Sequence, residues 1–403
     1  MRKFRPEDNA LLLWNLEKSR TAYISGEDLS ALKRWSEGEE CSGFTDRLTQ
    51  LGLITEDDKN AVNTAIKLAA KQKAPHNSFS VPESIHIELT GRCPLDCPQC
   101  YKAGERTDLP ISFLLDVIRQ AGEMQVFQIA LGGGEPLVYP QLLSVIKEIR
   151  HHGMASSITT SGAGTGAELM IALMEAGLSH IQISLNGSSE KIHSHSRNGF
   201  EHGQEALKVA RKLGMSYGVN WVARMDNIDD FPVFAEFAKS YQAQNLNILR
   251  YKPSPNEEYR RYALSAEKAR LLEKMIRNIR GIRVKVDSAY SNLRCKLNKQ
   301  SSFMSGCGAG RRFIALDSHG YYRPCSHVSL KEQSGSLHHV WHCSENLEMF
   351  RSLGNRIKDL CAECGYLHSC YGCRAVLLEQ EDDFYSGDKQ CVFAAVESKG
   401  QNS

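Results

Sequence analysis

Three cysteines in one short loop, Cys93, Cys97 and Cys100, place the strongest constraint on this chain. The loop follows Ile85–Leu89, a run that is typical of a β-strand. Closed zinc sites take four ligands, whereas soft thiolates also hold iron–sulfur clusters. A [4Fe–4S] cluster bound by only three thiolates keeps one iron open to another molecule. The loop therefore favours an iron–sulfur centre, and the alternative is a zinc site that borrows a distant fourth ligand.

Length, charge and cysteine content limit the possible settings. The 403 residues suffice for two or three domains, and the mixed charges with a net +2 give no reason to expect a nucleic-acid or membrane partner. No stretch approaches the roughly 18 apolar residues of a spanning helix, and Met1–Pro6 lacks a signal-peptide pattern. We therefore expect a cytoplasmic protein, in which 13 cysteines indicate metal or redox cofactors rather than disulfides.

Strand-like and helix-like patterns alternate between about residues 82 and 290, which predicts βα units and a parallel sheet. The six expected strands are Ile85–Leu89, Phe127–Leu131, Ser156–Thr160, His180–Leu185, Ser216–Val222 and Asn245–Leu249. Parallel barrels carry their chemistry at the carboxyl ends of the strands. The polar and glycine residues at those ends are Gly133, Gly134, Glu135 and Pro136 after the second strand, Ser184 on the fourth and Arg197 beyond it.

The three-cysteine loop, with Tyr101 directly after its last cysteine, resembles the signature of the radical S-adenosylmethionine (radical SAM) enzymes. The resemblance implies a partial (β/α)6 barrel and an open iron that chelates the amino and carboxylate groups of SAM. It further implies reductive cleavage of SAM to a 5′-deoxyadenosyl radical, which abstracts a hydrogen atom. Tyr101 belongs to the expected cofactor site.

The strand-end residues extend this resemblance. Gly133–Pro136 resembles the GGEP motif of the family, which implies contact with the SAM amino group. Ser184 matches a SAM-contacting serine, and Arg197 resembles an arginine that meets the SAM carboxylate; the alternative for Arg197 is a solvated surface side chain. We expect Glu135 and Arg197 at the mouth of the barrel rather than in the core. Thr160–Gly162 receives no role, and His193 and His195 are expected to be loop histidines.

A second set of cysteines lies near the C-terminus. Its spacing resembles the seven-cysteine SPASM signature, with two residues instead of three between the sixth pair, and its members are Cys307, Cys325, Cys361, Cys364, Cys370, Cys373 and Cys391. The resemblance implies two auxiliary [4Fe–4S] clusters, so three in all. The first would take Cys307, Cys325, Cys373 and the candidate Cys295, and the second Cys361, Cys364, Cys370 and Cys391. Cys41 and Cys343 remain, and both are expected to be buried thiols. The alternative is a pair of zinc ribbons.

The N-terminal residues predict a β-hairpin, Ala10–Leu16 with Thr21–Ile24, then a helix after Ser25, a second helix near Asp46–Gly52, and a strand. Residues 56–80 suggest a polar helix and a linker. The hairpin and small winged-helix unit resemble the RiPP recognition element, which implies leader-peptide binding by strand addition, with pockets near Trp14 and Tyr23. An inert cap and a DNA-binding winged helix are the alternatives, and the second helix carries only Arg47 as a cation.

Together these features predict an α/β protein with a peptide-binding domain at 1–75, a radical SAM partial barrel at 76–290 and a SPASM domain at 291–403. The resemblance implies a maturase that forms thioether crosslinks of the ranthipeptide or sactipeptide kind in a precursor peptide with leader and core. Its cofactors would be SAM and the three clusters, and its electron donor a flavodoxin or ferredoxin. Alternatives are carbon–carbon crosslinking, epimerisation or decarboxylation of a peptide, formylglycine formation on a sulfatase, and a non-enzymatic iron–sulfur carrier that binds peptides.

Overall fold

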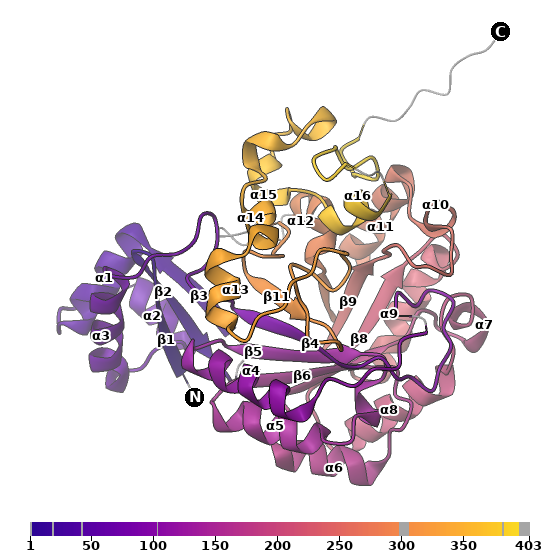
Figure 1. Ribbon diagram of the computed structural model, residues 1–403, viewed down its shortest axis with the longest axis horizontal. Coiled ribbons are helices and arrows are strands. Elements are labelled where there is room, and N and C mark those ends of the chain that lie inside the picture. Colours follow the sequence, from indigo (N-terminus) through magenta and orange to yellow (C-terminus); the bar gives the residue numbers. More distant parts are fainter. Residues whose placement is uncertain are drawn as a thin grey trace.

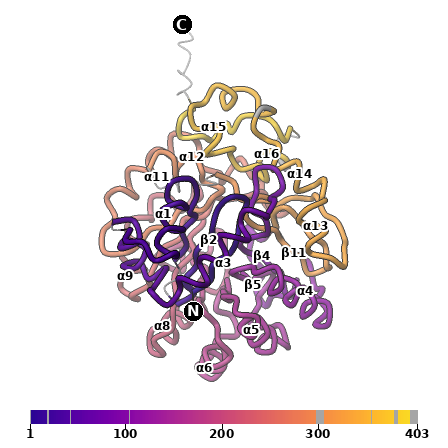
Figure 2. Tube along the Cα trace, turned by 90° about the vertical axis from the view of Figure 1, so that its left-hand side faces the viewer, coloured from indigo at the N-terminus to yellow at the C-terminus, as the bar shows by residue number. Residues whose placement is uncertain are grey.

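The computed structural model describes residues 2–17, 20–41, 43–102, 104–297, 306–380 and 383–394. They form a three-stranded sheet near the N-terminus, a nine-stranded sheet in the middle, and a cysteine-rich segment near the C-terminus (Figure 1). The cysteine-rich segment lies over one end of the large sheet in both views (Figures 1 and 2). The predicted α/β class is confirmed.

The N-terminal unit is an antiparallel sheet covered by helices. Its strands are β1 (Arg2–Glu7), β2 (Ala10–Asn15) and β3 (Arg20–Ser25), and its helices are α1 (Gly26–Ser36), α2 (Phe44–Gln50) and α3 (Lys59–Ala69). Leu11 and Leu13 of β2 pack with the helices, whereas Leu12 and Trp14 pack toward the large sheet, as the two-residue period of a strand requires. The expected hairpin and both helices are present.

Three details of this unit differ from expectation. β1 was not expected, and the strand expected after the second helix is a turn followed by the short 3-10 helix η1 (Glu56–Asp58). The helix expected to be polar is α3, which buries Val62, Ala65 and Ile66 against the sheet. The apolar face at i, i+3 and i+4 is hidden in the sequence among lysines and asparagines.

The central sheet is a parallel barrel sheet with helices outside it. All six expected strands are present as β4 (Ser84–Thr90), β5 (Gln128–Gly133), β6 (Ala155–Thr160), β7 (His180–Ser184), β8 (Tyr217–Ala223) and β9 (Asn245–Arg250), and β10 (Arg283–Val286) extends them. The covering helices are α4 (Ile111–Glu123), α5 (Leu142–His151), α6 (Ala167–Ala176), α8 (Phe200–Lys212), α9 (Phe231–Ser240) and α11 (Ala266–Asn278). The core lies between strands and helices, because Ile85 and Ile87 face it with no exposed surface.

The large sheet also takes strands from the cysteine-rich part of the chain. β11 (Phe313–Leu316) pairs parallel with β4, and β12 (Tyr322–Arg323) pairs antiparallel with β11. The predicted domain boundary at residue 290 therefore cuts through one continuous sheet. The remaining helices are α7 (Glu190–His193), α10 (Tyr259–Tyr262), α12 (Ser291–Lys296), α13 (Leu337–Cys343), α14 (Glu345–Arg351), α15 (Leu367–Cys370) and α16 (Arg374–Gln380).

A buried junction, formed by Arg5, Glu7, Trp14, Ser80 and Phe127, joins the N-terminal unit to the barrel. Arg5 bonds Glu7 and also donates Nη1 to the Pro82 carbonyl at 2.9 Å. Glu7 accepts from the Ser80 backbone N–H at 2.7 Å, and the ring of Trp14 lies 4.7 Å from that of Phe127. The N-terminal unit is thus fixed by polar and aromatic contacts together.

The two residues expected to form peptide pockets lie at or beside this junction. Trp14 is 7% exposed and packs on Phe127, while the ring of Tyr23 lies 6.1 Å from that of Phe79. Both rings thus contact residues outside the N-terminal unit. Their role in peptide binding stays a prediction.

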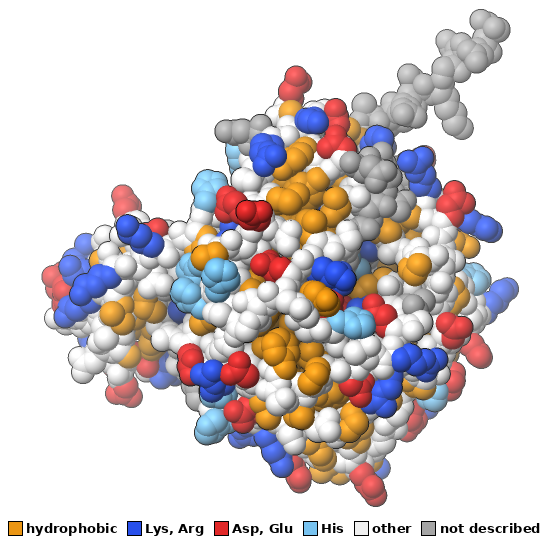
Figure 3. Space-filling model, viewed as in Figure 1, with side chains coloured by type: hydrophobic (Ala, Val, Ile, Leu, Met, Phe, Trp, Pro, Cys, Tyr) orange, Lys and Arg blue, Asp and Glu red, His pale blue; other side chains and the backbone are white. Residues whose placement is uncertain are grey.

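The surface shows no dominance of one charge. On the face drawn in Figure 3, Lys and Arg side chains are interspersed with Asp and Glu. Within the described ranges, no helix has the length and apolar character needed to traverse a lipid bilayer.

Candidate active site and cysteine clusters

The three-cysteine loop follows β4 and is held against the loop after α7. The backbone N–H of Asn198 donates to Sγ of Cys97 at 3.4 Å, and the Asn198 side chain donates to the Asp96 carbonyl at 2.5 Å. In return, the Gln99 N–H donates to the Ser196 carbonyl at 3.2 Å. Hydrogen bonds therefore hold the cysteine loop to Ser196 and Asn198, the two neighbours of Arg197.

The thiols of this loop interact with one another. Burial raises the pKa of Cys93 and of Cys100, the negative charge of Cys97 adds to both shifts, and backbone N–H groups of Leu95 and Lys102 oppose them. Three neighbouring thiolates without a counter-charge repel each other, whereas bound metal ions deprotonate such thiols outright. The donor set, thiols already supplied with N–H donors, fits an iron–sulfur cluster.

The glycines after β5 bring its backbone against the start of the cysteine loop. Gly133 has φ of +115°, and a Cβ there would lie 2.4 Å from the Thr90 carbonyl oxygen. A Cβ on Gly134 would lie 2.3 Å from the Arg92 carbonyl oxygen. Only glycine permits this approach, so Gly133 and Gly134 set the spacing between the second strand end and the cysteines.

Glu135 lies in the core, not at the open mouth as expected. It is 1% exposed, and its carboxylate accepts from Thr160 Oγ1 at 2.6 Å, from Ser161 N–H at 2.9 Å and from Leu137 N–H at 3.2 Å. Burial raises the pKa of the Glu135 carboxyl, and these donors oppose the shift. Its side chain thereby joins the ends of β5 and β6. Its partners include Thr160 and Ser161, for which no role was predicted.

Arg197 has a buried guanidinium nitrogen that is available to an anion. Its Nε is buried and has no hydrogen-bond partner among the described residues. Its positive charge lowers the pKa of Cys100, although burial outweighs that effect. A buried donor without a partner costs about 1–3 kcal/mol. An orphaned guanidinium nitrogen beside the cysteine loop therefore fits a carboxylate ligand, and a fully solvated arginine does not match this burial.

His193 is a buried helix residue rather than a loop histidine. It ends α7, is 1% exposed, and its ring nitrogens contact the Asn186 N–H at 3.2 Å and the Asn198 carbonyl at 3.3 Å. Burial lowers its pKa to about 4. His193 thus holds the segment that carries Arg197. Ser184 ends β7 and is 8% exposed, so it lies at the expected strand end.

Tyr101 lies in a polar cluster beside the cysteines. Its hydroxyl donates to Glu88 at 2.9 Å, and Glu88 also pairs with Lys102 at 2.6 Å. The Tyr101 ring lies 4.2 Å from the ring of His327, which comes from the cysteine-rich segment. The cluster therefore connects the cysteine loop with that segment.

The fold and this site agree with the comparisons to known proteins. The profile of the Radical SAM superfamily matches residues 87–238. Residues 87–238 are a radical SAM domain. The superfamily to which this domain is similar uses SAM and a [4Fe–4S] cluster as cofactors.

Longer alignments relate the chain to a curated protein and to two solved structures. The PqqA peptide cyclase of Bradyrhizobium diazoefficiens is 25% identical over 352 residues, which are 80% of this chain and 90% of that protein. Streptococcus suis SuiB bound to S-adenosylmethionine has a TM-score of 0.75 at 19% identity, over 97% of this chain and 98% of SuiB. SuiB bound to precursor peptide SuiA has a TM-score of 0.74 at 19% identity, over 97% of this chain and 100% of that SuiB chain. The likeness to SuiB shows a shared fold beyond the radical SAM domain.

The structure separates the C-terminal cysteines into groups. Cys307, Cys325 and Cys373 form the first, since the charges of Cys307 and Cys373 both act on Cys325. Burial raises the pKa of Cys307 to about 11 and that of Cys325 to about 12, and the neighbouring thiolates add to both shifts. The candidate fourth member, Cys295, instead lies against Cys370, with which it shares a hydrogen bond. Its assignment to the first set stays a prediction.

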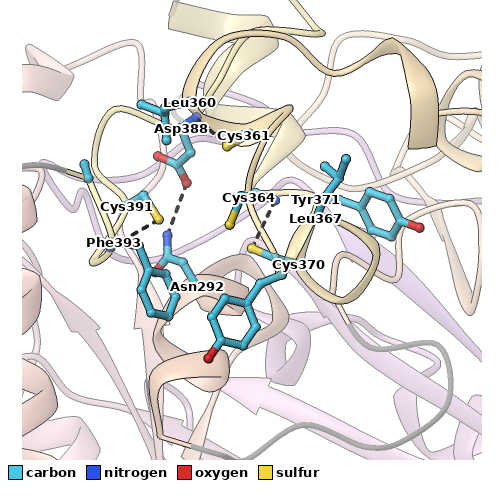
Figure 4. Close-up of a pocket in the computed structure, with 13 residues that line it drawn as sticks. Asn292, Leu360, Cys361, Cys364, Leu367, Cys370, Tyr371, Asp388, Cys391 and Phe393 are labelled. Atoms are coloured by element: carbon cyan, nitrogen blue, oxygen red, sulfur yellow. Dashed lines mark hydrogen bonds between the residues drawn. The ribbon is translucent and has the colours of Figure 1, made fainter.

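The second group surrounds one cavity. Cys361, Cys364, Cys370 and Cys391 line a space of about 230 Å³, and Figure 4 shows their sulfur atoms around it. Backbone N–H groups donate to three of these sulfurs, those of Cys361, Cys370 and Cys391, at 3.4–3.5 Å. Four thiols around one cavity, with N–H donors in place, fit a four-iron cluster. The structure contains no described group of three or more His, Cys, Asp and Glu side chains arranged around a single ion.

A buried ion pair joins this cavity to the large sheet. Asp388, which lines the cavity, accepts from Arg250 at 2.5 and 2.9 Å in a bidentate pair at the end of β9. The same carboxylate accepts from Asn292 at 3.4 Å. Cys41 and Cys343 lie outside both groups. Cys41 is half-buried, and Cys343 is exposed rather than buried as expected, because α13 turns it away from the core.

Proposed function

We propose that the chain is a maturase that forms a thioether crosslink in a ribosomally made precursor peptide. The observation that carries the proposal is the match along 97% of the chain to SuiB bound to precursor peptide SuiA. That match includes the N-terminal unit, which neither cleaves SAM nor holds the cysteine sets. The name of the aligned relative, PqqA peptide cyclase, also supports a peptide substrate. A sulfatase-maturing enzyme or an electron carrier would leave the N-terminal unit without a purpose.

The proposed cofactors are SAM and three [4Fe–4S] clusters. Cys93, Cys97 and Cys100 would hold the cluster that binds SAM, which on reduction supplies the 5′-deoxyadenosyl radical. Arg197 would bind the SAM carboxylate through its free Nε. The backbone of Gly133–Pro136, fixed by the Glu135 carboxylate, would bind the amino group. Ser184 and Tyr101 would complete the cofactor site.

The N-terminal sheet offers an edge for a leader peptide. Among the described residues β3 lies at the edge of its sheet beside β2, and Arg20, Thr21 and Ser25 along it are exposed. A leader can add there as a fourth strand. Because the junction buries Trp14, we assign apolar selection to the more accessible Tyr23. The setting would be the cytoplasm, with a flavodoxin or ferredoxin as reductant.

Hydrogen–deuterium exchange on the full chain tests this edge. Addition of the leader peptide should protect the β3 amides, while those of β1, at the other edge, stay unchanged. Protection confined to α1 or α2, or none at saturating leader, would refute strand addition. An inert cap predicts no change anywhere in residues 1–75.

The decisive activity test uses the precursor peptide, SAM and a strong reductant without air. We expect 5′-deoxyadenosine and a peptide that has lost a pair of hydrogens and one alkylatable cysteine thiol. A precursor whose cysteine is replaced by alanine should keep its full mass. Turnover of SAM with unchanged peptide mass would contradict the proposal.

A second candidate product is a carbon–carbon crosslink, and the likeness to a peptide cyclase favours it. That product also loses a pair of hydrogens, but the cysteine thiol remains free. Alkylation with iodoacetamide before mass spectrometry therefore separates the two: added mass on every cysteine indicates a carbon–carbon bond.

A further inference from the structure

Arg374 is a buried guanidinium whose donors are only partly used. It is the first residue of α16, directly after Cys373, and has no exposed surface. Its Nη1 donates to the carbonyls of Phe384 at 2.7 Å and Ser386 at 3.1 Å. Its Nε and Nη2 have no partner among the described residues. Buried donors without partners are unfavourable, which points to an acceptor that binds there.

The space beside Nη2 is kept open by a glycine. A Cβ on Gly372, which has φ of +62°, would lie 2.7 Å from Nη2 of Arg374. Any larger residue there would displace the guanidinium. Gly372 on one side and the carbonyls of Phe384 and Ser386 on the other therefore hold the guanidinium in position.

The surroundings of Arg374 belong to both auxiliary cysteine sets. Burial lowers its pKa, and the negative charges that oppose this shift come from Asp388, Cys307, Cys361 and Cys373. Cys307 and Cys373 are in the first set and Cys361 is in the second. Asp388 already bonds Arg250 in a bidentate pair, so it leaves Nε and Nη2 free. Arg374 thus lies near members of both sets: it directly follows Cys373, and Gly372, where an added Cβ would meet its Nη2, donates its N–H to Sγ of Cys370 at 3.4 Å.

We propose that Arg374 is a positioning residue for both auxiliary clusters, donating its Nε–H and Nη2–H to sulfur atoms at the two cysteine sets. Reduction adds negative charge to a cluster, so a nearby cation with hydrogen bonds to sulfur favours the reduced form. Arg374 therefore raises the reduction potentials of both clusters. The inference rests on the proposed auxiliary clusters.

The test compares full-length Arg374→Met and Arg374→Lys after anaerobic reconstitution with iron and sulfide. Midpoint potentials are followed by electron paramagnetic resonance during a redox titration. Both auxiliary couples should shift to more negative potential in Arg374→Met and by less in Arg374→Lys, which keeps the charge but loses the planar donors. The SAM-binding cluster should keep its potential, because the strongest charges acting on Arg374 come from Asp388 and the C-terminal cysteines.

Arg351 provides a matched control. It is 1% exposed and lies in the same part of the chain, but its donors are used by the carbonyls of Gly310 at 2.8 Å and Trp341 at 2.6 Å. Arg351→Met should destabilise the protein and leave all three potentials unchanged. A shift in this variant equal to that of Arg374→Met would overturn the inference, because it would reflect general disturbance.

The remaining outcomes also decide. Normal iron content with unchanged potentials in both Arg374 variants overturns the inference. If only Arg374→Met loses auxiliary iron, the potentials of Arg374→Lys decide whether the inference holds. If both Arg374 variants lose auxiliary iron while Arg351→Met keeps it, the result supports the positioning role. Wild-type protein with about four irons per chain after reconstitution would instead refute the auxiliary clusters themselves.

Discussion

The junction between the N-terminal unit and the barrel buries an arginine, and so does the cysteine-rich segment. The two arginines differ in how many of their donors have hydrogen-bond partners. Arg5, 2% exposed, bonds Glu7 and the carbonyls of Pro82 and Val81. Arg374, with no exposure, leaves Nε and Nη2 without partners among the described residues. A buried polar group whose hydrogen bonds are all made stabilises one structure. A buried group that lacks hydrogen-bond partners destabilises the protein and marks a site for a ligand.

The same contrast holds within the radical SAM domain. Glu135, like Arg5 and Glu7 at the junction, is hydrogen-bonded within the protein. Arg197, like Arg374, has a buried Nε without a hydrogen-bond partner among the described residues. Satisfied groups should therefore affect folding when replaced, and unsatisfied groups should affect ligands. Four substitutions test this rule, in order of decreasing effect.

The largest effect is expected from the three-cysteine loop. Replacing Cys93, Cys97 and Cys100 together by Ala should abolish 5′-deoxyadenosine formation, because no thiolate remains to bind the SAM cluster. Leader binding, measured by fluorescence anisotropy, should be unchanged because the N-terminal unit is a separate site. Persistent 5′-deoxyadenosine in the triple variant would show that the loop is not the cluster site.

The junction should respond in the opposite way. Glu7→Ala leaves Arg5 and the Ser80 N–H buried without their carboxylate partner, and we expect a loss of about 3–5 kcal/mol in the free energy of unfolding. Denaturant unfolding of the apo protein measures this loss. SAM cleavage per folded molecule should be normal. A change below about 0.5 kcal/mol would break the proposed contrast.

Arg197 should affect the ligand and spare the fold. A hydrogen bond to a charged group contributes about 1.5–3 kcal/mol, so Arg197→Ala should weaken SAM binding by roughly 10- to 150-fold. Calorimetric titration of the reconstituted protein measures the affinity, and a thermal melt of the apo form provides the control. Unchanged SAM affinity would place the carboxylate elsewhere.

The smallest effect belongs to a cysteine outside both groups. Cys343 is exposed, so Cys343→Ser should alter the free energy of unfolding by less than about 0.5 kcal/mol. Iron content after reconstitution should equal that of wild type. A lower iron count would add Cys343 to the ligands and redraw the cysteine groups.

The sequence predicted the parts of the fold that depend on local patterns. The six parallel strands were visible because short apolar runs alternate with amphipathic helices. The cysteine positions were visible because the spacing of ligands is itself local. β11 was missed because only four residues, Phe313–Leu316, form it, and its partner β4 lies far back in the chain.

The site residues that escaped prediction act through contacts between distant segments. Thr160 and Ser161 matter because they meet Glu135 across two strand ends. Arg374 carries a weak signal, its position directly after Cys373, but its free nitrogens appear only once the segment is folded. Burial and partner count are three-dimensional properties that no spacing rule supplies.

The pairing of β11 with β4 has a consequence for synthesis of the chain. β4 ends at Thr90 and β11 begins at Phe313, so the ribosome makes more than two hundred residues between them. At about 5–20 residues per second, one edge of β4 stays open for roughly 10–45 s. An open edge beside Ile85 and Ile87 invites pairing with another nascent chain. Slower translation before residue 313 should therefore lower the soluble yield, and chaperones that shield strand edges should restore it.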